Sequence, residues 1–271
     1  MSAARPSFFD PCLPVLGRIP PKGPDWVHQA KLDGYRFLIA KIGQRVRFYS
    51  KSGAEWSDRL PSLAEAFAAL QTDFILDGEL CLCDDRGRPD FRALHTEMRL
   101  RRPDTSQMAY FAFDLLFDRD VDLRPLPLSE RQRDLTRLCD KARKAMPCLF
   151  LVESFPKGEP LLEWCEHYQL EGIVSKRLTS RYSSGTCRDW QKTKTEGWRK
   201  SNEFRHKLFE GCKKLTELTE RDRALVRKRE ELARICERLR DADLGQAVAR
   251  ELRRHQAVLE REIAELEAGK N

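Results

Sequence analysis

Between residues 25 and 200 the chain alternates short strand-like runs with helical ones, and this alternation limits the folds that it can adopt. Some strand-like runs are joined by short turns, as Phe37–Ile42 and Val46–Tyr49 are around Gly43. Such strand pairs, interrupted by helices, favour an α+β fold built on antiparallel sheets. The other predicted strands are Phe74–Leu76, Leu80–Cys83, Tyr110–Phe117, Leu149–Glu153, Gly172–Lys176 and Trp190–Lys194, and the predicted helices are 61–70, 91–100 and 129–145.

The pattern changes after about residue 200. Proline is absent from 202 onward, and acidic and basic residues alternate densely. Leucines recur at intervals of seven in two blocks, on either side of a break at 241–245. This spacing is typical of two amphipathic helices that fold back on each other, and it favours a structural role or self-association over a basic arm for nucleic acid. The leucines are Leu218, Leu225 and Leu232, then Leu252, Leu259 and Leu266, with Ile235 and Leu239 extending the first block.

We therefore divide the chain into three parts: an extended, proline-rich lead-in (1–24), an α+β body (25–200) and a charged helical hairpin (201–271). The net charge of +7 favours a polyanionic partner. The nine cysteines include no C-x-x-C pair, so we expect reduced, mostly buried thiols of a cytoplasmic protein. No run of about 18 apolar residues predicts a membrane span.

The hexapeptide from Lys31 to Arg36, K-L-D-G-Y-R, concentrates the chemistry. It places an amine, a carboxylate, a glycine and a guanidinium within six residues, a set suited to attack on a phosphate. A lysine amine attacks only when it is neutral, and its usual pKa of about 10.4 leaves almost none neutral at pH 7. Burial and neighbouring cations would lower that pKa. The alternative is a simple hairpin turn, which Asp-Gly often forms.

Five more segments follow the hexapeptide, and together they fit nucleotidyl transfer. Acids such as Glu79 and Glu171, with Asp77 as a further candidate, suit Mg²⁺, which favours carboxylate and phosphate oxygens. Lysines on one strand face could hold an α-phosphate, and an aromatic strand could stack on a purine. Singly, each segment also fits a turn, a core strand or an exposed edge. The segments are Ser50–Gly53, Leu76–Leu80, Tyr110–Leu116, Glu171–Arg177 and Trp190–Lys194.

Taken in order, these motifs resemble those of an ATP-dependent DNA ligase of the covalent nucleotidyltransferase superfamily. The resemblance is closest to the ligase domains of bacterial end-joining repair enzymes, and it runs from about Phe8 to Phe209. It implies an adenylation domain of two antiparallel sheets flanked by helices, with ATP bound between the sheets. It also implies Mg²⁺ or Mn²⁺ as the metal, and nicked or broken double-stranded DNA as the substrate.

The resemblance also implies a role for each motif residue. Lys31 would take AMP from ATP as a phosphoramide, and Asp33 would assist the final sealing step. In the ATP site, Arg36 would contact the ribose side, Phe113 would stack on adenine, and Lys192 and Lys194 would hold the α-phosphate. Glu79 would contact the ribose hydroxyl or the metal, and Glu171 would serve the metal. Gln29, Ala30 and Lys176 are also expected in the ATP site, and Lys51 and Arg188 at the nick phosphates.

The chain departs from the family pattern at three places. Gln29 stands where the family commonly has glutamate accepting from the adenine amino group, which its amide oxygen could still do. Lys51 replaces a frequent arginine. The helical hairpin stands where DNA ligases continue into an OB-fold. Beside the ligase, we therefore keep as alternatives a ligase-like repair scaffold with weak or no sealing activity, an RNA ligase or capping-type enzyme, and help in trans from a repair protein or OB-fold partner.

Overall fold

The computed structural model describes residues 8–84, 87–200, 228, 231–232, 235–236, 238–239 and 246–268. The chain divides into two compact units, residues 1–201 and 202–271, and each is described by itself. The strands of the first unit are β1 (Cys12–Gly17), β2 (Trp26–Lys31), β3 (Tyr35–Ile42), β4 (Arg45–Ser50), β5 (Phe74–Leu82), β6 (Met108–Asp118), β7 (Val121–Asp122), β8 (Leu149–Leu151), β9 (Gly172–Arg177) and β10 (Gly185–Lys194). Its helices are η1 (Ser57–Arg59), α1 (Pro61–Ala68), α2 (Phe91–Met98), α3 (Leu128–Ala142) and α4 (Gly158–His167).

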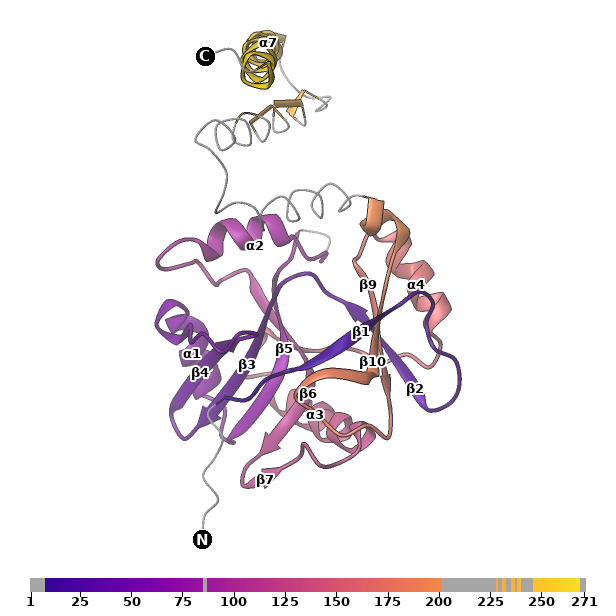
Figure 1. Ribbon diagram of the computed structural model, residues 1–271. Coiled ribbons are helices and arrows are strands. Elements are labelled where there is room, and N and C mark those ends of the chain that lie inside the picture. Colours follow the sequence, from indigo (N-terminus) through magenta and orange to yellow (C-terminus); the bar gives the residue numbers. More distant parts are fainter. Residues whose placement is uncertain are drawn as a thin grey trace. The chain divides into compact units, whose positions relative to one another are not determined.

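These strands form two sheets that lie side by side, as Figure 1 shows. Sheet A has the order β1-β10-β9-β2, and sheet B has the order β4-β3-β5-β6-β7 with β8 beside β6. Most neighbours are antiparallel, but β1 with β10 and β6 with β8 are parallel pairs. Helix α4 packs on sheet A, and α1, α2 and α3 pack on sheet B. The predicted α+β fold of two sheets flanked by helices is confirmed.

Sheet B is buried on both faces, which explains why its strands read as continuous apolar runs. In β3, Phe37 and Ile39 point into a core shared with α1, α2 and α3. The alternate residues Leu38 and Ala40 point the other way, into a second core that includes Trp190 of sheet A. The second core therefore joins the two sheets.

Two local predictions need correction. The runs Phe74–Leu76 and Leu80–Cys83 form one strand, β5, and Asp77-Gly78 is not a turn between them. Asp77 stays within the strand because Arg36 of the neighbouring β3 binds its carboxylate. Gly78 is required there because a Cβ atom would lie 2.5 Å from the Phe111 carbonyl oxygen. In addition, the proline-rich lead-in contributes a strand, β1, at the edge of sheet A.

The described part of the second unit is helical and contains α7 (Gln246–Glu267). An ion pair of Lys228 with Glu262, and a contact of 3.3 Å between His255 Nε2 and a Glu231 carboxylate oxygen, connect α7 to helical residues before it. The partners run in opposite directions along the chain, as in the predicted antiparallel hairpin, and Ile235, Leu259 and Ile263 are buried. Leu218 and Leu225 lie outside the described residues, and self-association stays a prediction. None of the described helices has the length and apolar composition that crossing a bilayer requires.

Candidate active site

A cavity of about 800 Å³ opens between the two sheets. Both sheets contribute its lining, so residues far apart in sequence meet there. The predicted site residues that line it are Gln29, Ala30, Lys31, Arg36, Lys51, Glu79, Phe113, Lys176 and Lys192. Glu171 forms an ion pair with Lys31 and a second ion pair with Lys194.

The hexapeptide is the crossing from one sheet to the other. Lys31 ends β2 in sheet A, and Tyr35 begins β3 in sheet B. The hairpin interpretation of Asp33-Gly34 is therefore wrong, because the strands on either side do not pair. A Cβ atom on Gly34 would lie 2.3 Å from the Leu80 carbonyl oxygen, so only glycine allows the crossing to pass this close to β5. This crossing places Lys31 in the lining of the cavity.

Strand register brings Glu171 between two lysines. Gly172 of β9 pairs with both Lys31 of β2 and Lys194 of β10. Glu171, one residue earlier, therefore lies at the ends of both neighbouring strands. Its carboxylate accepts from Lys31 Nζ at 2.6 Å and lies 3.2 Å from Lys194 Nζ. Gly172 has φ +148°, and a Cβ atom there would lie 2.1 Å from the Thr193 carbonyl oxygen, so this approach also requires glycine.

The charges around Lys31 decide its protonation. Burial lowers the pKa of Lys31, but the charges of Glu171, Glu79 and Asp33 together raise it above its usual value. The expectation that neighbouring cations would lower this pKa is therefore wrong for the free protein. Those cations act on Lys192 instead: burial, followed by the charges of Lys194, Lys31 and Lys51, lowers its pKa. The lysines repel one another when no anion is bound. A bound anion such as a phosphate would relieve this repulsion, so the group of lysines is suited to bind one.

The buried carboxylate of Asp77 holds Arg36 in place. Arg36 donates to both carboxylate oxygens of Asp77, at 2.9 and 2.6 Å, and Asp77 is fully buried. The Tyr182 hydroxyl donates to the same carboxylate at 2.6 Å and accepts from the Cys12 backbone N–H at 3.0 Å. A paired guanidinium of this kind is fixed in position. Its neighbour Glu79 has a pKa that burial raises to about 7, against the lowering effects of Lys31 and Arg36.

Phe113 faces the cavity because of a β-bulge. Asp77 of β5 pairs with Asp114, but Gly78 pairs with Ala112, so Phe113 is the extra residue between them. A bulge re-aims the side chain of the extra residue. Lys176 Nζ lies 4.4 Å from the centre of the Phe113 ring and 4.0 Å from that of Trp190. Burial lowers the pKa of Lys176 to about 7, although the charges of Asp114 and Asp77 oppose the change.

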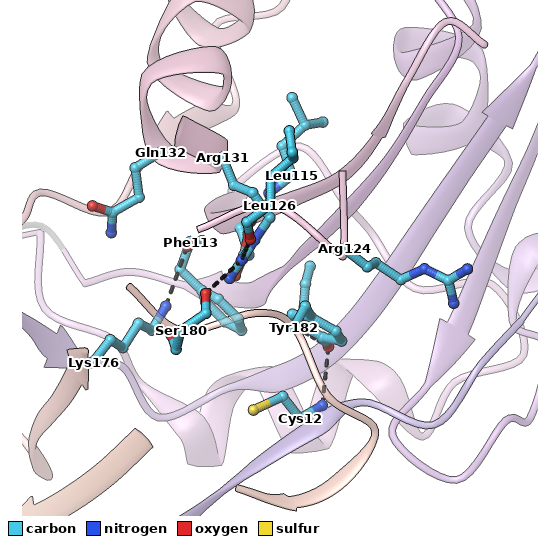
Figure 2. Close-up of polar contacts among 12 residues, drawn as sticks. Cys12, Phe113, Leu115, Arg124, Leu126, Arg131, Gln132, Lys176, Ser180 and Tyr182 are labelled. Atoms are coloured by element: carbon cyan, nitrogen blue, oxygen red, sulfur yellow. Dashed lines mark hydrogen bonds and ion pairs between the residues drawn. The ribbon is translucent and has the colours of Figure 1, made fainter. Parts of the chain in front are cut away.

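Behind the bulge lies a second buried ion pair. Asp114 and Arg131 are both fully buried, and the guanidinium donates to both carboxylate oxygens, at 2.8 and 2.9 Å. Figure 2 shows Arg131 reaching from α3 toward the segment that carries Ser180 and Tyr182. Arg131 also donates to the carbonyl oxygens of Ser180 and Leu126, at 2.9 and 2.6 Å. The ion pair thus connects α3, the strand of Phe113 and the segment of Tyr182.

Other predicted residues lie further out. Asp33 is close enough for its charge to raise the pKa of both Lys31 and Glu79. Lys51 lines the cavity and is exposed. Arg188 is exposed on β10 and is not among the residues that line the cavity. Sequence reasoning missed Tyr182, Val152 and the place of Trp190 in the lining. Trp190 is the first residue of a predicted motif, while the other two carry no local signal.

Comparison with known proteins identifies the family and supports the fold. A sequence model of the ATP-dependent DNA ligase domain matches residues 19–194. The chain belongs to this family. The ligase domain is 36% identical over 193 residues to the multifunctional non-homologous end joining protein LigD of Pseudomonas aeruginosa, an alignment that covers 70% of this chain and 22% of that protein. It is 31% identical over 202 residues to the bifunctional end joining protein LigD of Bacillus subtilis, covering 67% and 33%.

Solved structures agree. The crystal structure of the ligase domain from Mycobacterium tuberculosis LigD aligns with a TM-score of 0.58 and 28% identity, covering 68% of this chain and 60% of that one. A mycobacterial DNA ligase D complexed with ATP and MES aligns with the same TM-score and 29% identity, covering the same shares. The aligned region makes up about a fifth of the Pseudomonas LigD protein and a third of the Bacillus LigD protein, so the chain spans only part of the length of these relatives.

Proposed function

We propose that this chain is an ATP-dependent DNA ligase that forms a lysine–AMP adduct on Lys31 and uses it to seal breaks in double-stranded DNA. The observation that carries the proposal is the position of Lys31. Its side chain lines a cavity large enough for a nucleotide and pairs with Glu171, which also pairs with Lys194. Membership of the ligase family and similarity to end-joining proteins support the same reaction.

In the first step, the neutral amine of Lys31 attacks the α-phosphorus of ATP. The new P–N bond replaces the bond to the β-phosphate oxygen, and pyrophosphate leaves. Lys192 and Lys194 stabilise the charge that develops on the α-phosphate. Phe113 stacks on the adenine ring, and Arg36, fixed by Asp77, contacts the ribose side. These groups are already in place before ATP arrives. Catalysis of this step therefore depends mainly on holding ATP in position and on stabilising the charge of its phosphates.

The acids of the site also suit a divalent cation. Mg²⁺ in nucleotide enzymes is usually held by one or two carboxylates together with substrate phosphates and water. Glu79 and Glu171 supply such a pair near Lys31, whose pKa both of them raise by their charge. We therefore assign the metal to Glu79 and Glu171. A bound cation would neutralise the phosphate charge and favour the neutral form of Lys31.

The later steps use DNA. The 5′-phosphate at a break attacks the lysine–AMP phosphorus, so the P–N bond breaks and an AMP-capped 5′ end forms. The 3′-hydroxyl then attacks the capped phosphate, closing the backbone and releasing AMP, and Asp33 assists this attack. We assign the contacts with the phosphates of the break to Lys51 and Arg188, which are both exposed cations.

The test is adduct formation followed by sealing. Purified protein is incubated with α-labelled ATP and Mg²⁺, separated on a denaturing gel, and then supplied with a nicked duplex. We expect a labelled band that Lys31→Ala abolishes, while the exposed-lysine control Lys157→Ala leaves it unchanged. A band that persists in Lys31→Ala would place the nucleophile elsewhere. Label taken only from GTP would favour a capping-type enzyme, and an adduct that never seals DNA would favour a scaffold role.

A further inference from the structure

Lys194 lies between an acid and an aromatic ring. Its Nζ atom is 3.2 Å from a Glu171 carboxylate oxygen and 3.5 Å from the centre of the Trp198 ring. Trp198 belongs to none of the six motifs and stands four residues after Lys194, where the chain has already left β10. This contact therefore adds to the site a residue that the motifs do not contain.

The two neighbours act differently on the charge of Lys194. A carboxylate neutralises an ammonium group, whereas the face of an aromatic ring attracts it through the ring quadrupole and leaves its positive charge in place. If a phosphate replaces Glu171 as the partner of Lys194, the ring can still hold the ammonium group. Trp198 thus restrains the lysine without competing with an anion for its charge.

Trp198 belongs to a short helix that is attached to α4. Residues 196–200 are helical, and Figure 1 shows this helix beside α4. The backbone N–H groups of Glu196 and Gly197, at its first turn, both donate to the Glu166 carboxylate of α4, each at 2.7 Å. A carboxylate at this end also interacts favourably with the helix dipole. Glu166 therefore decides where the helix begins.

The residue between Lys194 and the helix is fixed as well. Thr195 is 2% exposed, and its hydroxyl donates to the Leu170 carbonyl oxygen at 2.8 Å. Its backbone N–H donates to the Glu171 carbonyl oxygen at 3.1 Å. The segment that carries Glu171 thus also holds the start of the helix. The acid and the ring on either side of Lys194 have a common support.

We propose that Trp198 is a positioning residue for the adenylation step, which holds the charged end of Lys194 in place for the α-phosphate of ATP. Glu166 in turn holds the helix of Trp198. The inference rests on the proposed function, in which Lys194 contacts that phosphate. Trp198 acts through Lys194, and Glu166 acts through Trp198, so each effect should disappear when the residue through which it acts is removed.

The experiment measures binding of α,β-methylene ATP, in which carbon replaces the oxygen between the α- and β-phosphorus atoms, so that Lys31 cannot release pyrophosphate. Calorimetry with Mg²⁺ gives the affinity. We expect Trp198→Leu to bind the analogue about 3- to 10-fold more weakly than the unmodified protein, because the ring is lost. Trp198→Phe keeps an aromatic face and should stay within about 2-fold. The matched control is Trp164→Leu, at an exposed tryptophan on α4, which should change nothing.

The decisive comparison repeats these measurements without the lysine. Lys194→Met should weaken binding by itself, and adding Trp198→Leu to it should cost less than about 2-fold more. A ring that only stabilised the fold would cause the same loss in both backgrounds. Glu166→Ala should likewise weaken binding when Trp198 is present and have little effect in Trp198→Leu. Glu163→Ala, at an exposed glutamate of α4, is its control.

An unchanged affinity in Trp198→Leu would overturn the inference, and so would an equal loss with and without Lys194. If Lys194→Met bound the analogue as tightly as the unmodified protein, the phosphate contact of Lys194 would be refuted and the inference with it. Adduct formation from ATP is measured separately on the unmodified protein. Coupling between Trp198 and Lys194 without any lysine–AMP adduct would refute the proposed function and leave the role of Trp198 in nucleotide binding standing.

Discussion

Lys31 and Glu171 form an ion pair with 2.6 Å between the amine nitrogen and a carboxylate oxygen. This pair gives the proposed nucleophile a location and also keeps it protonated. Burial alone would lower the pKa of Lys31, and the acids around it reverse that effect. The free protein thus holds its nucleophile in an unreactive form. Arrival of ATP and a cation would have to change the charge balance before the amine attacks.

The first prediction concerns this pair. Glu171→Gln removes the charge that most raises the pKa of Lys31, so the pKa should fall. Because kcat/KM reports on ionisations of the free enzyme, its rise with pH during adduct formation should begin at lower pH in the variant. The rate at high pH should nevertheless be lower by roughly 10-fold or more, since Glu171 is also assigned to the metal. The measurement is a pH–rate profile.

The control for this profile is Glu163→Gln, an exposed glutamate on α4, which should leave both its midpoint and its height unchanged. A profile of Glu171→Gln that rises at the same pH as the unmodified enzyme would show that Glu171 does not control the protonation of Lys31.

The second prediction concerns stability. Burial raises the pKa of Glu79 to about 7 in the folded protein, from its ordinary value of 4.5. The folded state therefore binds this proton more tightly than the unfolded state, and ionised Glu79 destabilises the fold. The penalty is absent well below pH 4.5, grows between the two pKa values, and is complete above about pH 7.

Glu79→Gln should remove this penalty, which is on the order of 1 to 3 kcal/mol above pH 7. The variant should therefore melt several degrees higher than the unmodified protein at about pH 8, and within about a degree of it at about pH 4. Thermal unfolding followed by circular dichroism at both pH values checks this. An equal rise in melting temperature at both pH values would mean that the gain comes from packing and not from the charge of Glu79. The same variant should lose adduct formation, because Glu79 is proposed to contact ribose or metal.

The third prediction concerns Tyr182. Tyr182→Phe removes a hydrogen bond to the buried Asp77 carboxylate and leaves the Cys12 N–H without its acceptor. Loss of a hydrogen bond to a charged group costs about 1.5 to 3 kcal/mol. Because Asp77 fixes Arg36, we also expect the KM for ATP to rise several-fold, with a smaller change in kcat. Urea unfolding and adduct kinetics measure the two effects, and Tyr168→Phe, at an exposed tyrosine, should change neither.

The sequence predicted the reactive and binding side chains of the site better than it predicted the contacts that hold them in place. Motif residues such as Lys31 and Glu171 could be found because their types and order repeat a known pattern. The sheet crossing at Asp33-Gly34 could not, since Asp-Gly marks a hairpin equally well. Only the packing of Gly34 on β5 distinguishes the two.

The contacts that support the site residues could not be predicted from the sequence for a similar reason. Asp77 and Asp114 are paired across two strands, and each is neutralised by an arginine from elsewhere. Tyr182 meets Asp77 across 105 residues of chain, and Gln29 meets Val152 across 123. No local pattern encodes such contacts, because they depend on the register of strands that the rest of the fold fixes. The protonation of Lys31 was wrongly predicted because its neighbouring acids could not be located.

The last prediction concerns Asp114 and Arg131. Both are fully buried, so Arg131→Met leaves an unpaired carboxylate and should cost about 3 to 5 kcal/mol. The ion pair of Arg137 with Asp134, also on α3 but near the surface, gives a matched control. Arg137→Met should cost less than about 1 kcal/mol. Urea unfolding measures both. Burying an uncompensated charge is the cause, so Arg131→Met combined with Asp114→Asn should recover much of the loss.

Recovery should remain incomplete, because Arg131 also donates to the carbonyl oxygens of Leu126 and Ser180. In the double variant both oxygens lose this hydrogen bond, although the Leu128 N–H still donates to Ser180. A double-mutant cycle separates the two contributions. Full recovery would mean that these carbonyls find other donors. No recovery would mean that Arg131 acts through them alone, and that the segment carrying Tyr182, rather than the strand carrying Phe113, depends on it.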